Sequence, residues 1–197
     1  EEIRRKFSIS TSVVPIEWKF WKINLLDTPG YLDFAGEVDE ALAAADGAII
    51  VINGKAGVEA GTEKAWAYCE KYGIPRVFFV TNMDDEHADY MKVVDQLREL
   101  YGKRIAPFHL PIREDHKFTG VVNVVTLKGR RFTGGGKWEE RDVPDDVQDD
   151  LEPCREALME AVAETSEEYM ERYFDGGEFT VDEIIDALRV NVNEGSV

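Results

Sequence analysis

Residues 24–34, NLLDTPGYLDF, decide the fold, because an apolar run ends there at an acidic residue that is followed by a turn. The run stops at Asp27, a Thr-Pro-Gly turn follows at residues 28–30, and Tyr31 comes next. In an open α/β sheet, ligands bind beyond the carboxyl ends of the strands. Asp27 can hold a magnesium ion, usually through water, and Gly30 can bring a backbone N–H close to a phosphate. This stretch therefore predicts an α/β sheet with a phosphate-binding edge.

Strands and helices alternate around this stretch. Short β-branched or apolar runs predict strands at residues 8–14, 21–26, 47–53, 76–81 and 105–112. The first two form a hairpin with its turn near Lys19 and Phe20, and the third is buried on both faces. Helices are predicted at residues 33–45, 61–73 and 87–102, with Thr62 as an N-cap and with Gly73 and Gly102 as terminators. Such alternation implies right-handed crossovers and a parallel sheet.

The pattern changes near Pro111, where an α+β subdomain is predicted. Residues 118–144 are expected to form two or three short antiparallel strands with glycine turns, and residues 144–174 a long acidic amphipathic helical region. A last helix begins at Thr180, with Glu183 completing a capping box. The inward side of the acidic region is expected to consist of Leu151, Cys154, Leu158, Ala161 and Val162.

Composition narrows the class of protein. Hydrophobic residues make up 44% of the 197 residues, and 40 Asp and Glu against 23 Lys and Arg give a net charge of −17. Such a field repels nucleic acid, which argues against a sequence-reading nucleic-acid binder. No apolar run approaches the ~20 residues of a membrane span. Two distant cysteines, in no zinc or disulfide pattern, predict a reduced cytoplasmic protein. The first and last residues are typical of an excised fragment.

A second polar tetrad, TNMD at residues 81–84, also follows a predicted strand. Alone it is weak evidence, because any polar turn before a helix has this composition. In a parallel sheet, however, it lies on the same edge as residues 27–30, and the ordered pair is a much stronger signal. The glycine run at residues 134–136 lacks the Lys-Ser/Thr and helix of a phosphate loop, which favours a flexible hairpin tip.

Four stretches together resemble the GTPase domain of translation elongation factor G: KINLLDTPGYLDFAGEV, LAAADGAIIVINGKAGVEAGTEKAW, KYGIPRVFFVTNMD and LPIREDHKFTGVVNVV. The resemblance covers essentially the whole chain. It implies a P-loop GTPase-type, mostly parallel sheet with helices on both faces, whose first strand, phosphate loop and last strand lie outside this chain. It also implies a partial GTPase domain at residues 1–110, an inserted α+β subdomain at 111–190, and the return to the GTPase domain at 191–197.

The resemblance implies roles for individual residues. In the turn formed by Asp27, Thr28, Pro29 and Gly30, the acid binds Mg²⁺ through water and the glycine amide senses the γ-phosphate. Ser8 stands where the family places a metal-ligating threonine at the end of switch I. The tetrad Thr81, Asn82, Met83 and Asp84 corresponds to the guanine-reading motif, in which the last acid accepts hydrogen bonds from the base.

This chain departs from the family at functional positions. Tyr31 replaces a histidine that helps to position the attacking water, and a phenol with a pKa of ~10 is a poor base at neutral pH. Thr81 replaces an asparagine, Asn82 a lysine that packs on the base, and Lys6 a glycine of switch I. These departures bear on guanine affinity and on hydrolysis rate rather than on the fold.

The resemblance implies a cytoplasmic, ribosome-associated GTPase that uses GTP and Mg²⁺ and couples hydrolysis to translocation in the full-length protein. In the family, the inserted subdomain touches the ribosomal stalk protein. No GxxxxGK[ST] motif occurs in this chain, so we expect the chain alone to be inactive and to hold no tightly bound nucleotide. Two alternatives stay open: a tetracycline-resistance-type ribosomal protection GTPase, and a ribosome-binding paralogue with little GTP turnover. Neither membrane nor sequence-specific nucleic-acid binding is expected.

Overall fold

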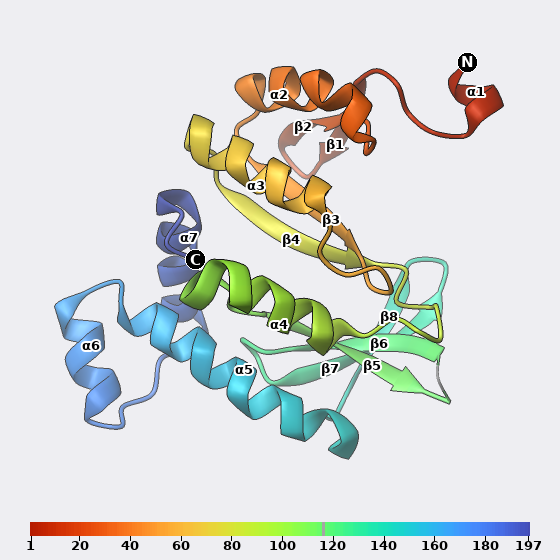
Figure 1. Ribbon diagram of the computed structural model, residues 1–197. Helices are drawn as coiled ribbons and strands as arrows, with labels where there is room; N and C mark the ends of the chain where they lie inside the picture. Colours follow the sequence, from red (N-terminus) through yellow and green to blue (C-terminus); the bar gives the residue numbers. More distant parts are fainter. Residues whose placement is uncertain (116) are drawn as a thin grey trace. The chain divides into compact units, whose positions relative to one another are not determined.

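The structure is a computed structural model that describes residues 1–115 and 117–197. It contains two compact units (Figure 1). The first unit comprises Glu1–Ile50 and Glu59–Phe78, and the second comprises Val51–Val58 and Phe79–Val197. Two strands, β3 (Ala48–Asn53) and β4 (Arg76–Thr81), contribute residues to both units.

The first unit opens with a short helix and a hairpin. Its elements besides β3 and β4 are α1 (Glu2–Arg5), β1 (Ser12–Trp18), β2 (Trp21–Asp27), the 3-10 helix η1 (Leu32–Phe34), α2 (Ala35–Ala44) and α3 (Ala60–Tyr72). Strands β1 and β2 pair antiparallel, with Ser12 opposite Asp27 and Trp18 opposite Trp21. Lys19 adopts a left-handed φ of 53° in the connecting turn. The predicted hairpin and the position of its turn are therefore confirmed.

The first strand begins later than predicted, at Ser12 rather than at residue 8. The reason is that the preceding amides bond to side chains instead of to a neighbouring strand. The Glu2 carboxylate accepts hydrogen bonds from the backbone N–H of Ile9 (2.6 Å) and Ser10 (3.1 Å). The N–H of Thr11 donates to Glu37 of α2 (2.6 Å).

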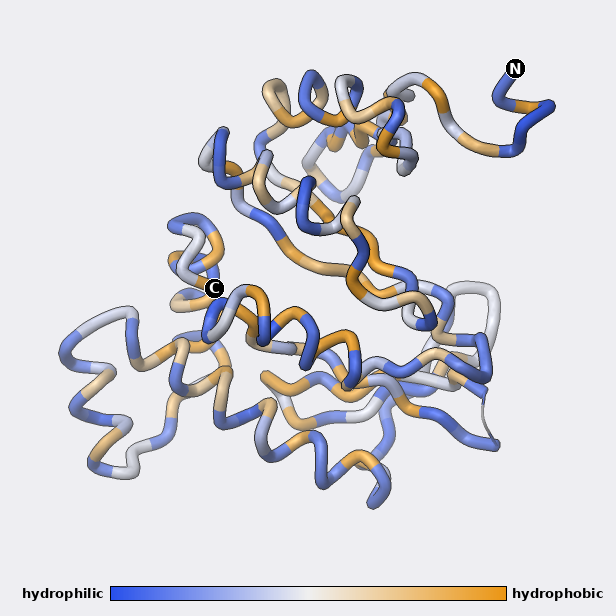
Figure 2. The backbone as a smooth tube through the Cα atoms, viewed as in Figure 1, coloured by the Kyte–Doolittle hydropathy of each residue, from blue (hydrophilic) through white to orange (hydrophobic). Residues whose placement is uncertain are grey.

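Strands β3 and β4 form a parallel pair. The N–H of Ala48 donates to the carbonyl of Pro75 (2.8 Å), and the N–H of Gly54 donates to the carbonyl of Thr81 (2.9 Å). Figure 2 shows most of β3 in hydrophobic colours. The prediction that this strand is buried on both faces was wrong, however, because burial alternates along β3. Ile50 and Ile52 are buried and the residues between and beside them are not.

Helix ends follow local chemistry closely. Gly73 ends α3 at a left-handed φ of 63°, and Gly102 ends α4 (Tyr90–Tyr101), both as predicted. The N-cap of α3 is Glu59 rather than Thr62, whose hydroxyl lies at the third helical position and accepts the N–H of Glu59 (3.4 Å). Helix α4 starts after Asp89, whose carboxylate accepts the N–H of Lys92 (3.0 Å).

The second unit contains a four-stranded antiparallel sheet in the order β5-β6-β7-β8. Its remaining elements are η2 (Gly102–Arg104), β5 (His109–Glu114), β6 (Lys117–Asn123), β7 (Lys128–Gly134), β8 (Lys137–Arg141), α5 (Asp145–Ala163), α6 (Glu167–Phe174) and α7 (Val181–Glu194). The assignment of the strand predicted at residues 105–112 to the parallel sheet was thus wrong. The strand runs through His109–Glu114 and joins the antiparallel sheet, because the short connection to β6 dictates hairpin pairing.

A single apolar cluster joins this sheet to α5 and α7. Leu110, Ile112 and Val122 of the sheet pack in one cluster with Leu158 of α5 and Ile184 of α7. The predicted inward side of the acidic region is buried, including Cys154. The capping box at the start of α7 is confirmed, since Thr180 and Glu183 each accept the other's backbone N–H. The α/β class with a parallel pair and an added α+β part is therefore confirmed.

Both cysteines are enclosed. Cys69 and Cys154 have no exposed surface, and burial raises the pKa of each thiol. Among the described residues, no helix combines the length and the apolar character that crossing a membrane requires.

Candidate functional site

The turn after β2 leaves its functional atoms open. Asp27 is the last residue of β2, and its side chain is exposed, as is Gly30. Pro29 is buried and holds the turn against the unit. A Cβ placed on Gly30 would meet nothing within 4 Å, so space for a ligand exists beside this backbone. The chemistry expected of an acid and a glycine at a strand end is therefore sterically possible here.

Tyr31 packs against the segment that precedes β1. Its ring centroid lies 4.5 Å from that of Phe7 at an interplanar angle of 51°, and the ring of Phe34 lies 6.3 Å from Phe7. Even so, 57% of Tyr31 is exposed. The Tyr31 side chain is thus supported on one side by an aromatic ring and open on the other.

Ser8 lies between two anchors of this N-terminal segment. On one side Phe7 contacts Tyr31, and on the other the Glu2 carboxylate accepts the N–H groups of Ile9 and Ser10. These hydrogen bonds, first that of Ile9 and then that of Ser10, hold the pKa of Glu2 below its usual value. Ser8 therefore lies in the same unit as the turn after β2.

Ser8 and Asp27 belong to the same unit and carry oxygens of the kind that a hydrated magnesium ion binds. Within residues 1–115 and 117–197, the side chains of Ser8 and Asp27 make no hydrogen bond or ion pair, which leaves their oxygens available. No group of three or more His, Cys, Asp or Glu side chains that could hold a metal occurs in the same residues. One carboxylate and one hydroxyl fit Mg²⁺, which binds through one or two protein oxygens together with substrate phosphates and water.

The loop after β4 is built more firmly. The hydroxyl of Thr81 donates to the carbonyl of Ile52 (3.2 Å). Asn82 adopts a left-handed φ of 56°, a conformation that asparagine tolerates better than most residues. Met83 is buried, whereas Asp84 is exposed and, within the described part of the chain, its side chain makes no hydrogen bond or ion pair. The loop thus presents a carboxylate that is free to accept hydrogen bonds.

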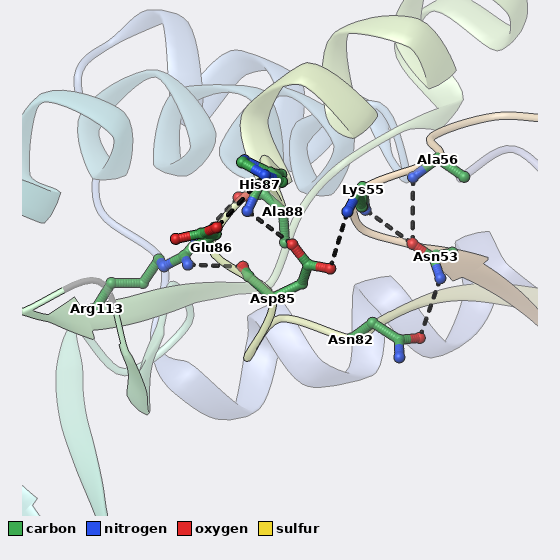
Figure 3. Close-up of polar contacts among 9 residues, drawn as sticks. All are labelled: Asn53, Lys55, Ala56, Asn82, Asp85, Glu86, His87, Ala88 and Arg113. Carbon is green, nitrogen blue, oxygen red and sulfur yellow. Dashed lines mark hydrogen bonds and ion pairs between the residues drawn. The ribbon is translucent and has the colours of Figure 1, made fainter.

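A second loop, after β3, supports the first. The side-chain oxygen of Asn53 accepts the N–H groups of Lys55 (2.9 Å) and Ala56 (3.2 Å), and its amide nitrogen donates to Asn82 (3.3 Å). Lys55 forms an ion pair with Asp85 (3.3 Å). Figure 3 shows these contacts running from one loop to the other. The neighbouring strand end therefore helps to hold the loop after β4 in place.

Gly54 is required by close packing between these loops. A Cβ at this position would lie 2.9 Å from the sulfur of Met83 and 3.1 Å from the carbonyl oxygen of Thr81. The first distance is shorter than real Cβ contacts, and the second is tighter than most of them, so a larger residue here would require Met83 or the Thr81 backbone to move. Glycine lets the backbone after β3 approach the loop this closely.

Asp85 is an ionisable residue of this loop whose pKa departs from its usual value. Its carboxylate accepts the backbone N–H of His87 (2.8 Å) and pairs with Lys55. The hydrogen bond from His87, followed by that from Lys55, lowers the pKa of Asp85 below its usual value. The carboxylate therefore stays ionised at neutral pH and ties the loop to its neighbour.

Four residues of this arrangement escaped the sequence analysis: Asn53, Lys55, Asp85 and Arg113. The sequence could have indicated Asn53 and Lys55, because they are polar residues at the carboxyl end of a strand parallel to β4. It could not have indicated Arg113, because the contact of Arg113 with the loop joins residues far apart in sequence.

Comparison with known proteins identifies the family of this chain. A family described as the elongation factor Tu GTP binding domain matches residues 1–187. The chain belongs to this GTPase family. Elongation factor G of Chlamydia caviae and elongation factor G of Chlamydia trachomatis serovar D are each 38% identical to it over 149 residues. These residues are 74% of this chain and 22% of each relative, so the chain spans about a fifth of the length of those proteins.

A solved structure agrees with this membership. A crystal structure of a protein from Thermus thermophilus matches with a TM-score of 0.88 and 34% sequence identity, covering 98% of this chain and 29% of that chain. The resemblance to elongation factor G found in the sequence is thereby confirmed. Both the parallel pair and the antiparallel sheet belong to the part of the chain that the family matches.

Proposed function

We propose that this chain belongs to a translational GTPase of the elongation factor G type, in which GTP hydrolysis on the ribosome drives translocation. The observation that carries the proposal is the loop after β4, which is braced by the loop after β3 and presents the free carboxylate of Asp84. The family match over residues 1–187 supports it. We place the protein in the cytoplasm and divide the chain at residues 1–110, 111–190 and 191–197.

Two groups of residues are assigned to the nucleotide. Asp84 accepts hydrogen bonds from the N1–H and 2-amino groups of guanine, a donor pattern that adenine lacks. Thr81, Asn82 and Met83 shape the loop beneath the base. The turn formed by Asp27, Thr28, Pro29 and Gly30 serves the γ-phosphate, to which the Gly30 amide donates a hydrogen bond. Phosphoryl transfer depends chiefly on positioning and on stabilising charge, which these groups supply.

Magnesium contributes charge neutralisation at the β- and γ-phosphates when it is bound. Asp27 would hold it through water, and the Ser8 hydroxyl would ligate it. The free oxygens of these two side chains in one unit support this assignment.

Substitution of Asp84 tests the proposal in the full-length protein. Asp84→Asn replaces two hydrogen bonds to a charged acceptor, so we expect GDP affinity to fall by roughly two orders of magnitude. Affinity for xanthosine diphosphate should rise, because its 2-oxo group can accept a hydrogen bond from the new amide. Fluorescence titration measures both, with Asp186→Asn, an exposed acid of α7, as the matched control. Equal losses for both nucleotides would contradict a base-reading role.

The chain alone provides a second arm. Because the 197 residues contain no GxxxxGK[ST] motif, we expect calorimetry to detect little GTP binding by them. Low-micromolar binding would show that phosphate recognition does not depend on such a loop.

The acidic helices of the inserted subdomain are our candidate for the stalk contact. Helix α5 begins with Asp145 and Asp146, and α6 with Glu167 and Glu168. Reversing these four charges should weaken binding to the stalk protein in a pull-down and leave GDP affinity unchanged. Unaltered stalk binding would count against this partner surface.

A second candidate function is a ribosome-binding paralogue with little turnover, and the environment of Tyr31 favours it. The phenol lies against Phe7, and a phenol is a poor base at neutral pH. GTP hydrolysis that stays at the intrinsic rate when ribosomes are added, and that Tyr31→His accelerates, would support this candidate. Strong stimulation of GTP hydrolysis by ribosomes in the unmodified protein would support the translational GTPase instead.

A further inference from the structure

Arg113 connects the antiparallel sheet to the guanine-reading loop. Its guanidinium donates one hydrogen bond to the carbonyl of Ala88 (2.6 Å) and another to the carbonyl of Asp85 (2.8 Å). Figure 3 shows the side chain reaching both carbonyls from β5. All three residues belong to the second unit, and the arginine is partly buried. A single side chain therefore ties two points of the loop to a strand that lies 25 residues beyond Ala88 in sequence.

A β-bulge aims the arginine. Ile112 lies opposite Gly120 and Arg113 opposite Phe118, so the register shifts between these two neighbours of β5. Bulges bend a strand locally and redirect side chains. Ile112 remains in the core with 1% of its surface exposed, while the next side chain turns to the loop.

The two carbonyls belong to Asp85 and Ala88, the residues at the two ends of one turn. The Asp85 carbonyl already accepts the N–H of Ala88 (3.1 Å), closing a turn that Arg113 reinforces from outside. The N–H of Asp89 donates to the carbonyl of Gly54 (3.0 Å), and Asn82 holds a left-handed φ at the other end. A guanidinium has donors in a rigid fork and can satisfy two carbonyls at once, which a lysine ammonium does less well.

We propose that Arg113 is a positioning residue for base recognition, and this inference rests on the proposed function. It fixes the backbone of residues 82–89, and the backbone in turn sets the direction of Asp84. Because the Asp84 side chain has no hydrogen bond or ion pair of its own in the described part of the chain, no other contact of that kind sets its direction. Guanine selectivity thus depends on a strand of the antiparallel sheet.

Hydrogen exchange of the 197-residue chain without nucleotide tests the clamp itself. In Arg113→Ala, we expect the amides of His87 and Ala88 to exchange at least about tenfold faster, because the turn they close loses its outer support. Arg113→Lys should give an intermediate rate. Arg130→Ala is the matched control: Arg130 lies on β7 of the same sheet, stacks on Trp138 at 4.2 Å, and should leave the loop amides unchanged.

Nucleotide binding by the full-length protein tests the recognition role. We expect Arg113→Ala to lower GDP affinity about tenfold, equivalent to about 1.4 kcal/mol. The preference for GDP over inosine diphosphate should fall as well, because inosine lacks the 2-amino group that Asp84 reads. Thermal unfolding of each variant identifies any general loss of stability, which would lower both affinities without changing their ratio.

The outcomes are distinguishable. Unchanged exchange at His87 and Ala88 would overturn the clamp, whatever the nucleotide data. Faster exchange with an unchanged GDP-to-inosine-diphosphate ratio would overturn the recognition role. Failure of the unmodified protein to bind GDP would overturn the proposed function and, with it, the recognition role, while the exchange result would still decide the clamp.

Discussion

The turn after β2 and the loop after β4, which belong to different units, are held to very different degrees. The turn after β2 exposes Asp27, Gly30 and Tyr31, and it is supported by the buried Pro29 and by the ring of Phe7. The loop after β4 is held by side-chain hydrogen bonds and an ion pair whose partners lie at the end of β3 and on β5. Backbone with few buried contacts opens at a low free-energy cost, whereas a braced loop does not.

This difference matches the two tasks that we propose. A base is the same in GTP and GDP, so a loop that reads it gains affinity from being preorganised. The γ-phosphate is present in only one of the two nucleotides, and a turn that must respond to it benefits from being weakly held. Under this proposal, the more firmly held loop reads the base and the weakly held turn responds to the γ-phosphate.

The largest expected effect comes from crowding the braced loop. Gly54→Ala places a methyl group 2.9 Å from the Met83 sulfur, and overpacking of this kind costs about 2 kcal/mol of unfolding free energy. Gly30→Ala is the matched control in the open turn, where the added Cβ meets nothing within 4 Å and the change should stay within about 0.5 kcal/mol. Urea unfolding of both variants makes the comparison, and similar losses would abolish the contrast.

A smaller effect is expected at the single aromatic support of the open turn. Phe7→Ala removes the ring that lies 4.5 Å from Tyr31, which should cost about 1 kcal/mol and increase the motion of the Tyr31 ring in NMR spectra. Phe20→Ala, at the fully exposed tip of the β1–β2 hairpin, should change neither quantity. A rigid Tyr31 in the Phe7 variant would mean that other contacts hold this turn.

Acidification should produce the smallest effect, in the N-terminal segment that contacts the open turn and in the braced loop. Each of Glu2 and Asp85 has a lowered pKa in the folded chain, so each contributes stability that is fully present above its unfolded value, 4.5 for Glu2 and 3.8 for Asp85. That contribution is lost as the pH falls through the folded pKa. Carboxyl NMR titration should place both midpoints below these values. A midpoint at or above the unfolded value would show that the corresponding hydrogen bonds are absent.

Local signals in the sequence were sufficient for much of the fold. The hairpin turn at Lys19, the glycine end of α3 and the capping box of Thr180 and Glu183 all depend on neighbours within four residues, and all were predicted correctly. The wrong prediction for β5 depends on a distant partner, whereas the N-cap of α3 was placed three residues too late within its own turn. β5 was assigned to the parallel sheet because its pairing with β6 is not visible in its own composition.

The same division applies to the site. The strand-end rule selected residues 27–30 and 81–84 without any structure, because each tetrad carries its own turn chemistry. The residues that brace the second loop were missed, since the contacts of Lys55 with Asp85 and of Arg113 with Ala88 span 30 and 25 residues. Sequence reasoning therefore proposes ligand-facing groups, which stay a prediction, but it does not reveal the groups that hold the second loop in place.

The enclosed cysteines make this chain convenient for site-selective labelling. Cys69 and Cys154 are fully buried with raised thiol pKa values, so thiol-reactive dyes should modify them slowly in the native state. A cysteine introduced at exposed Tyr31 or Glu86 would then be the fast-reacting thiol in an otherwise unaltered background. One fluorophore could follow the turn after β2 and another the loop after β4, each without removing a native residue from the core.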